Sequence, residues 1–189
     1  MIYVVDSPLR PYSHSYFMMH IVAEHTSEKI NLFSIPEPVT EMGICESLRK
    51  VLNNVTNDDI VLMSWVTPKN DNIDKMVDKI ADICSVVVAA GNDSCDIQNL
   101  TPAHLQSVIT VGCLNKSGSV SSCSNFSSGK QLVWAPGTNY FLNGHKQHGT
   151  SVSAAVYAGI LAESKKRKSP LLVNFLLDKY KQQVKKELK

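Results

Sequence analysis

The sequence lacks any long apolar stretch. Nowhere do about 18 apolar residues follow one another without interruption, which is roughly the length that a membrane-spanning helix needs. The chain also opens directly on the strand-like stretch Ile2 to Val5, which leaves no room for the basic and apolar segments of a secretory signal. These absences predict a protein that is neither exported nor inserted in a membrane.

Cysteine is scarce, and its five positions show no pattern. The odd number and the lack of CxxC spacing argue against a disulfide framework and against a zinc site. Free thiols fit a reducing compartment, so the expected location is cytoplasmic. The cysteines are Cys45, Cys84, Cys95, Cys113 and Cys123.

Neither sign of charge predominates, with 19 Lys or Arg against 17 Asp or Glu. The charge is unevenly placed, because residues 165–189 carry nine basic residues against Asp178 and Glu187. The favoured interpretation of the run Lys165 to Lys168 is a solvated helix C-terminus, where cations complement the helix dipole. Nucleic-acid binding is the alternative, but no aromatic stacking platform or recognition motif accompanies the charge.

Length and hydrophobic pattern predict a single domain over residues 1–189, because 43% hydrophobic residues suffice for a sizeable core. Short apolar runs alternate with helical periodicity, which predicts an α/β fold of three layers: a mostly parallel central sheet with helices on both faces. The expected strands are Ile2 to Asp6, Ile30 to Ile35, Asp59 to Trp65, Ser85 to Ala90 and Ser107 to Cys113. The expected helices are Ser13 to His25, Thr40 to Asn53, Asp71 to Cys84 and Ser151 to about Lys166.

The pattern changes after Cys113. Ser- and Gly-rich residues 117–129 and the turn-rich run 132–144 predict hairpins rather than helices. The small residues Ala154, Ala155, Ala158 and Gly159 predict that the helix from Ser151 is buried close to the sheet. A last, basic helix at about 170–189 is expected to cap the domain with an amphipathic face rather than to bind a partner.

A catalytic function is indicated by the run Gly149-Thr150-Ser151, which places a serine on the first turn of the long helix. A seryl hydroxyl is a poor nucleophile unless a base takes its proton and donors stabilise the oxyanion. Three upstream residues stand where strands end or helices begin and carry suitable groups: Asp6, His14 and Asn92.

Asp, His, Asn and Ser in this order resemble the subtilisin-like serine proteases, or subtilases. The resemblance spans nearly the whole chain and is strongest from about Ile83 to Leu161. The fragments that carry it are Val87-Val88-Ala89-Ala90-Gly91-Asn92, Thr101-Pro102-Ala103, Val108-Ile109-Thr110-Val111-Gly112, Ser124-Asn125-Phe126-Ser127, Ala135-Pro136-Gly137 and Gly149-Thr150-Ser151.

The resemblance implies a serine endopeptidase with Ser151 as nucleophile, His14 as general base and Asp6 as the carboxylate that orients it. Asn92 and the Ser151 N–H would form the oxyanion hole. Two departures stand out: the family usually has His-Gly-Thr-His where this chain has a different run after His14, and a glycine where Pro8 stands. Only seven residues separate Asp6 from His14, which suffices for a tight βα connection.

The same resemblance implies a primary specificity pocket walled by two segments, Ser64, Trp65 and Val66 on one side and Ala89, Ala90 and Gly91 on the other. The strand that leads into Ser64 would pair with extended substrate through main-chain hydrogen bonds. The family usually has glycine where Val66 stands, so a small residue is expected before the scissile bond. Trp65 fits a neighbouring subsite and a buried sheet position equally well.

No cofactor and no metal are expected, since the sequence has no calcium-binding cluster of carboxylates and carbonyls. The expected partner is a peptide or protein substrate, and limited processing of it is favoured over bulk degradation. Two alternatives remain open: a catalytically inactive interaction module that kept the fold, favoured by the departures around Pro8 and His14, and a peptide ligase or cyclase. The sequence does not indicate an oligomeric state.

Overall fold

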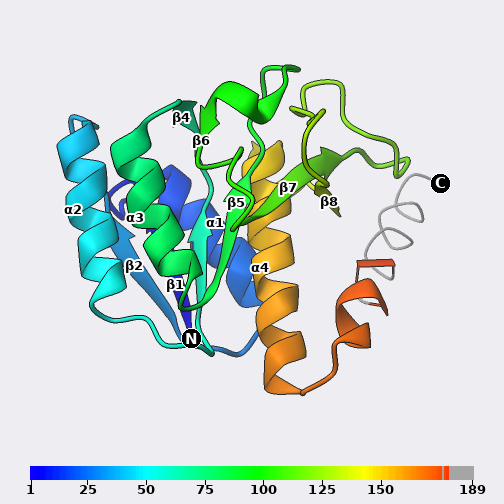
Figure 1. Cartoon of the computed structure of the whole chain (residues 1–189). Coiled ribbons are helices and arrows are strands. Elements are labelled where there is room, and N and C mark those ends of the chain that lie inside the picture. Colours follow the sequence, from blue (N-terminus) through cyan, green and yellow to red (C-terminus); the bar gives the residue numbers. More distant parts are fainter. Residues whose placement is uncertain (176, 179–189) are drawn as a thin grey trace.

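A six-stranded parallel sheet forms the centre of the computed structural model, which describes residues 1–175, 177 and 178 (Figure 1). Its strand order is β2-β1-β3-β5-β7-β8, and every neighbouring pair is parallel. The strands are β1 (Ile2–Asp6), β2 (Ile30–Ser34), β3 (Ile60–Met63), β5 (Ser85–Ala89), β7 (Ile109–Leu114) and β8 (Val133–Pro136). The predicted α/β architecture is confirmed.

The central strands are buried along their whole length. All residues of β1 and β3 are buried, and in β5 only Ser85 is partly exposed. A parallel sheet that is covered on both faces selects continuous apolar runs instead of alternating ones, and the sequence has them. This burial leaves only the strand ends free to carry polar chemistry.

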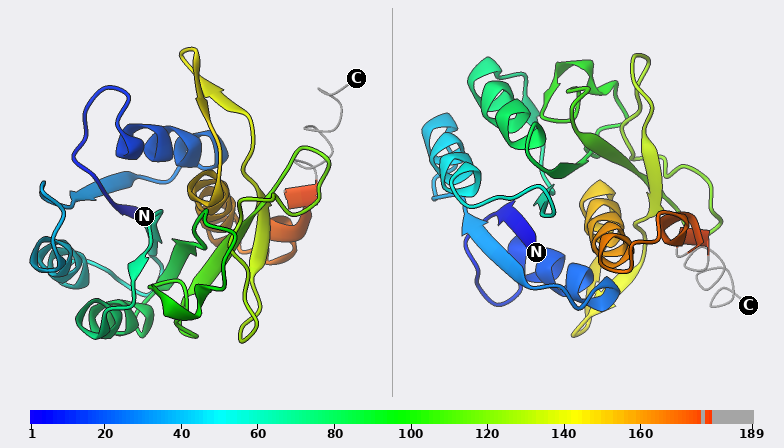
Figure 2. Two further views of the ribbon diagram at one scale, coloured as in Figure 1. Left: turned by 90° about the horizontal axis from the view of Figure 1, so that it is seen from above. Right: turned by 60° about the horizontal axis from the view of Figure 1, so that its bottom comes forward.

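Helices cover both faces of the sheet. Figure 2 shows α1 (His14–His25) and α4 (Thr150–Lys166) on one side, with α2 (Glu41–Leu52) and α3 (Asp71–Ala81) on the other. Two hydrophobic clusters match these layers: one joins the sheet to α1 and α4, and the other joins it to α2 and α3. The core is therefore divided by the sheet into two parts.

Helices α1 and α4 approach each other closely. A Cβ atom on Gly159 would lie 2.7 Å from the Cβ of His25 and 2.9 Å from the carbonyl oxygen of Val22. Ala154, Ala155 and Ala158 are fully buried along α4. The small-residue face that the sequence predicted thus lets α4 pack tightly against α1.

Capping side chains set the helix starts. Ser13 accepts a hydrogen bond from the backbone N–H of Tyr16, and Thr40 accepts one from Gly43. Each is an N-cap, so α1 and α2 begin one residue later than predicted. Helix α3 ends at Ala81, three residues before the predicted end at Cys84, because the chain turns there into β5.

The hairpin prediction for the second half of the chain is wrong for residues 133–136. They form β8, an edge strand parallel to β7, with Gly112 paired to Trp134. A side chain on Gly112 would collide with the Trp134 ring, so glycine in β7 leaves space for this ring to lie across the strand. The turn-rich composition around residues 133–136 gave no indication of a strand, although these residues pair with the central sheet.

A hairpin does occur directly afterwards, as β9 (Tyr140–Leu142) paired antiparallel with β10 (His145–Gln147). Its turn residues Asn143 and Gly144 both have positive φ, at 50° and 80°, as a two-residue hairpin turn requires. Residues 117–129 form loops and turns without an assigned strand. The short strands β4 (Thr67–Pro68) and β6 (Leu100–Thr101) pair antiparallel beside the 3₁₀ turn η1 (Ile97–Asn99).

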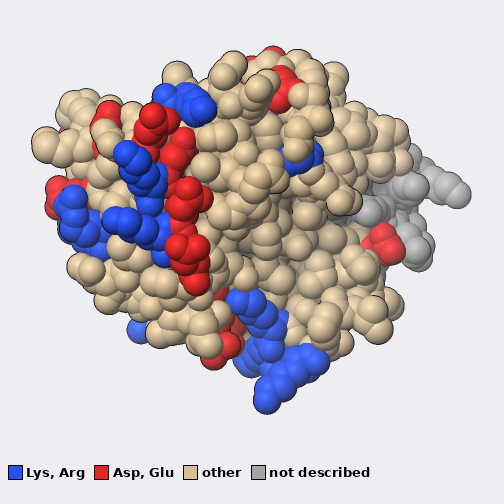
Figure 3. All heavy atoms as spheres, viewed as in Figure 1, with Lys and Arg blue, Asp and Glu red and all other residues tan. Residues whose placement is uncertain are grey.

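Basic residues gather at the end of α4, as Figure 3 shows. Lys166 donates to the hydroxyl of Ser27 over 2.6 Å, and Arg167 pairs with Glu163 over 2.6 Å while its side chain stays 64% exposed. This is the solvated helix C-terminus that the sequence favoured. Of the predicted last helix, residues 171–175, 177 and 178 are helical, and the remainder lies outside the described residues.

All five cysteines are free in the structure, with Cys84 and Cys113 buried. No helix in the described part of the chain is both long and apolar enough to cross a membrane.

Candidate active site

Three of the predicted site residues meet because the sheet is parallel. Asp6 ends β1, Ser64 follows β3 and Asn92 follows β5, so all three lie at the carboxyl edge of the sheet. Helices α1 and α4 begin at that same edge, and they bring His14 and Ser151 to it (Figures 1 and 2). Open α/β sheets place their ligand sites at this edge.

Asp6 is the most buried charged group of the site, at 4% exposure. Its carboxylate accepts hydrogen bonds from the Ser7 N–H (2.6 Å), the Ser64 hydroxyl (2.7 Å) and His14 Nδ1 (2.8 and 2.9 Å). Burial raises the pKa of Asp6, but the hydrogen bonds from His14, Ser64 and Ser7 outweigh it, so the pKa lies below its ordinary value. The carboxylate is therefore held ionised.

His14 is the first residue of α1 and is oriented by this carboxylate. A carboxylate can only accept, so the hydrogen bond assigns the proton of a neutral imidazole to Nδ1 and leaves a lone pair on Nε2. The His14 side chain is 40% exposed, which keeps the second nitrogen accessible. Ser13 helps to fix the ring position, because its hydroxyl caps the same helix start.

Ser64 links the two halves of the site. Its hydroxyl donates to Asp6, while its carbonyl oxygen accepts a hydrogen bond of 2.7 Å from the Ser151 hydroxyl. Among the described residues, His14 makes its hydrogen bonds with Asp6, and Ser151 Oγ makes its own with Ser64. The serine is thus linked to Asp6 through Ser64, with its hydroxyl turned to a backbone carbonyl.

The glycine turn before α4 explains how Ser151 is presented. Gly149 has φ = 113°, a left-handed value that favours glycine. A Cβ atom there would lie 2.8 Å from Asn92 Oδ1, so the Asn92 amide rests directly on the glycine. Ser151 follows within the first turn of α4, where backbone N–H groups have no intrahelical partner.

Asn92 is fixed by Thr150, a contact that the sequence did not indicate. Its Oδ1 accepts from the Thr150 N–H (2.9 Å) and the Thr150 hydroxyl (3.1 Å). That pattern assigns the amide: its oxygen faces the helix, and its NH₂ group is left as a donor. The Nδ2 of Asn92 and the N–H of Ser151 are therefore two donors near the start of α4.

Asn125 is a second residue that sequence reasoning missed, although it lies within a recognised fragment. It is fully buried, donates to the Ala90 carbonyl (2.9 Å) and accepts from the N–H groups of Asp93 (2.8 Å) and Cys95 (3.1 Å). These bonds hold the loop that carries Asn92. In the sequence, the available signal was an asparagine within an otherwise Ser-rich loop.

The two predicted pocket walls lie against each other. Val66 Cγ2 would lie 3.1 Å from a Cβ atom on Gly91, so the valine side chain lies against the backbone of the facing segment. Ala89, Ala90 and Gly91 are all buried. Trp65 donates its indole N–H to the Val5 carbonyl (2.8 Å) and packs on the hydrophobic cluster under α2 and α3.

No group of three or more His, Cys, Asp or Glu side chains close enough to hold a metal ion occurs in the described part of the chain.

A serine, an Asp-paired histidine and an asparagine amide beside the serine-bearing helix start, on a parallel α/β fold, are groups that serine hydrolases use. The model of the Subtilase family matches residues 23–178, so the chain belongs to this family. Asp6 and His14 lie before the matched span, whereas Ser64, Asn92 and Ser151 lie within it.

Curated relatives include a cuticle-degrading serine protease of Arthrobotrys oligospora, 34% identical over 97 residues, which are 50% of this chain and 24% of that protein. A subtilisin-like protease of Coccidioides posadasii is 33% identical over 134 residues, 63% of this chain and 32% of that protein. The chain therefore matches only about a quarter to a third of the length of these relatives.

Solved structures show the same fold. A cold adapted subtilisin-like serine proteinase superposes with a TM-score of 0.72 at 23% identity, over 94% of this chain and 80% of that one. The prenylagaramide maturation protease PagA gives a TM-score of 0.66 at 19% identity, over 89% of this chain and 77% of that one.

Proposed function

We propose that this chain is a serine endopeptidase that acts through Asp6, His14 and Ser151. The observation that carries the proposal is the position of Ser64, which contacts both Asp6 and Ser151 with hydrogen bonds of 2.7 Å. Asp6 from the first strand and Ser151 from the last long helix thus both bond to Ser64. Membership in the Subtilase family supports the same assignment.

The proposed reaction begins with a rotation of the Ser151 hydroxyl from the Ser64 carbonyl toward His14. Nε2 of His14 takes the hydroxyl proton as Oγ bonds to the peptide carbonyl carbon, and Asp6 stabilises the resulting imidazolium. Asn92 Nδ2 and the Ser151 N–H stabilise the oxyanion. His14 then gives the proton to the leaving amine, the C–N bond breaks, and water releases the acyl group by the same steps.

The proposed substrate is a peptide or protein with a small residue before the scissile bond, because Val66 lies against the backbone at Gly91. Limited processing is part of the proposal. Two structural neighbours are described as a maturation protease and a lanthipeptide protease, and these descriptions are in line with limited processing. Action inside the cell is also proposed, on the basis of the free cysteines.

One observation favours a second candidate, an inactive interaction module. The Ser151 hydroxyl is hydrogen-bonded to Ser64 instead of His14. If it cannot leave that carbonyl, the serine is not activated and the fold serves only for binding.

Mass spectrometry after treatment with diisopropyl fluorophosphate separates the two candidates. The endopeptidase predicts one adduct on the native chain, no adduct on Ser151→Ala, and a much slower reaction on His14→Ala. A native chain that stays unmodified supports the inactive module. An adduct that forms at full rate without His14 assigns the base to another residue.

A further inference from the structure

An aromatic cluster stands beside the candidate active site and joins its two halves. Tyr12, Tyr16, Phe17 and His145 form it, and we call these four residues the aromatic clasp. Tyr12 is its centre: its ring centroid lies 4.5 Å from that of His145, 5.8 Å from that of Tyr16 and 6.4 Å from that of Phe17. Phe17 in turn lies 6.1 Å from His145.

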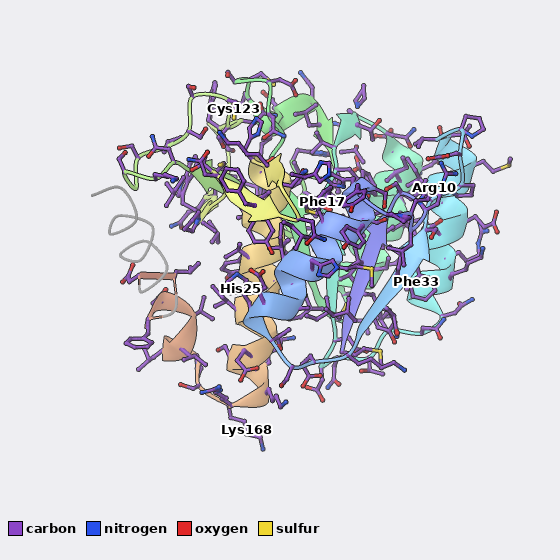
Figure 4. All side chains as sticks on the ribbon, turned by 180° about the vertical axis from the view of Figure 1, so that it is seen from behind. Arg10, Phe17, His25, Phe33, Cys123 and Lys168 are labelled. Carbon is purple, nitrogen blue, oxygen red and sulfur yellow. The ribbon has the colours of Figure 1, made fainter. Side chains whose placement is uncertain are left out.

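The clasp connects segments that carry different catalytic groups. Tyr12 stands two residues before His14, and Tyr16 and Phe17 belong to the first turns of α1, where Figure 4 labels Phe17. His145 begins β10, six residues before Ser151. Asn143 in the hairpin turn adds a hydrogen bond of 3.3 Å to the Tyr16 hydroxyl.

The hairpin that carries His145 is held at both of its strands. Strands β9 and β10 form a two-stranded sheet apart from the central one, and such a hairpin is marginally stable alone. Tyr140 and Leu142 pack on the core, while Phe141 is 62% exposed. Core packing thus attaches β9, and the clasp attaches the start of β10 to Tyr12 and to α1.

Tyr12 has an unfavourable backbone conformation. Its φ is 63°, in the left-handed region, although its side chain is large and 52% exposed. A residue other than glycine costs roughly 1–2 kcal/mol there and persists where surrounding contacts compensate. The ring contacts of the clasp compensate for the strain at Tyr12. Tyr12 itself lies on the short connection between Asp6 and His14.

We propose that Tyr12 is a positioning residue, and that the aromatic clasp sets the separation between the His14 imidazole and the Ser151 hydroxyl. The inference rests on the proposed function. Because Ser151 must turn from Ser64 to His14, the distance that it must bridge decides its reactivity, and an error of about 1 Å costs on the order of 10²-fold in rate.

The test uses Tyr12→Asn, which removes the ring while asparagine tolerates the left-handed backbone. His145→Ala opens the clasp from the opposite side, Tyr12→Phe restores the ring, and Phe141→Ala is a control in the same hairpin outside the clasp. Three quantities are measured: the rate of fluorophosphonate labelling at Ser151, kcat and KM on one peptide, and hydrogen exchange of residues 140–147.

The proposal predicts that Tyr12→Asn and His145→Ala each lower the labelling rate and kcat by about tenfold or more, with KM within about twofold. The double variant is expected to lose no more than either single one, because both remove the same contact. Hairpin exchange speeds up in both, and Tyr12→Phe and Phe141→Ala behave as the native chain.

The proposal is overturned if Tyr12→Asn is labelled within about threefold of the native rate. It is also overturned if only one of the two single variants loses labelling rate. A uniform rise in exchange across the central strands also overturns it, because the variant is then simply destabilised. Failure of the native chain to label refutes the proposed function instead, so the two failures are distinguishable.

Discussion

At the residue scale, Asn92 uses the two ends of its amide for different tasks. Its oxygen accepts two hydrogen bonds from Thr150, and in the proposed mechanism its nitrogen donates to the oxyanion. A change to alanine would remove both functions together. A change to aspartate keeps the acceptor and removes the donor.

Asn92→Asp is expected to lower the rate of peptide cleavage by about 10²- to 10³-fold, the typical loss for one oxyanion-hole donor. Its stability to urea should match that of the native chain, because Thr150 keeps its acceptor. Asn92→Ala should lose the same activity and, in addition, about 1–3 kcal/mol of stability, because the buried Thr150 donors lose their acceptor. Equal activity of Asn92→Asp and the native chain would remove Asn92 from the mechanism.

Asp6 makes stability depend on acid pH. Its pKa is below the ordinary value of 3.8, so the native state binds this proton less readily than the unfolded chain. The stabilisation is complete at pH values above the ordinary pKa and is lost as the pH falls through the lowered one. The advantage of the native chain over Asp6→Asn should therefore shrink in urea denaturation between pH 6 and pH 3.

Ser151→Ala is the matched control for that measurement, because it alters the same site and leaves the carboxylate in place. Its stability relative to the native chain should not change over this pH range. A constant gap between the native chain and Asp6→Asn would mean that the hydrogen bonds to Asp6 do not hold it ionised.

Val66 determines the predicted substrate preference. Val66→Gly removes the side chain that lies against Gly91, and it should raise kcat/KM for a substrate with Phe before the scissile bond at least tenfold relative to one with Ala. Val66→Thr has nearly the same shape and should keep the native preference. Equal or better cleavage after Phe by the native chain would refute the narrow pocket.

At the element scale, the contact between α1 and α4 determines whether the halves of the site meet. Gly159→Ala should destabilise the protein by about 1–3 kcal/mol, as overpacking in a core does, because the new methyl group meets backbone atoms of α1. Gly129→Ala is the control, since nothing lies within 4 Å of a Cβ atom there. Equal urea midpoints for the two variants would contradict the close approach.

Predictions from the sequence succeeded for elements whose own residues decide their structure. The continuous apolar runs in β1, β3 and β5 predicted buried parallel strands, and the small residues of α4 predicted its tight packing. They failed for β8, whose pairing depends on Gly112 leaving space for Trp134. That contact joins residues far apart in sequence, so no local pattern reveals it.

The features of the site likewise divide into those that local sequence predicts and those that depend on tertiary contacts. Gly149 and Ser151 form a local motif that identifies the turn, and the structure shows the positive φ that the glycine provides. The supports of Asn92 come from Thr150 and Asn125, which approach only when the sheet has formed. The orientation of the Ser151 hydroxyl toward Ser64 is likewise a product of tertiary packing.

At the scale of the whole molecule, the candidate catalytic groups and the basic residues that end α4 lie at opposite ends of the fold. The carboxyl edge carries Asp6, His14, Asn92 and Ser151, whereas the basic residues that end α4 lie at the far end of that helix (Figures 1 and 3). Changes of charge at the basic end should therefore affect solubility and association more than the reaction.

The order of the catalytic groups along the chain has a consequence for synthesis. Asp6 and His14 are made before Ser151, the proposed nucleophile, which belongs to a helix that begins at Thr150 and packs against both the sheet and α1. Every shorter nascent chain lacks both that hydroxyl and a substantial part of one core layer. In the proposed mechanism, no chain can therefore cleave a peptide bond through Ser151 before the first turn of α4 has been made.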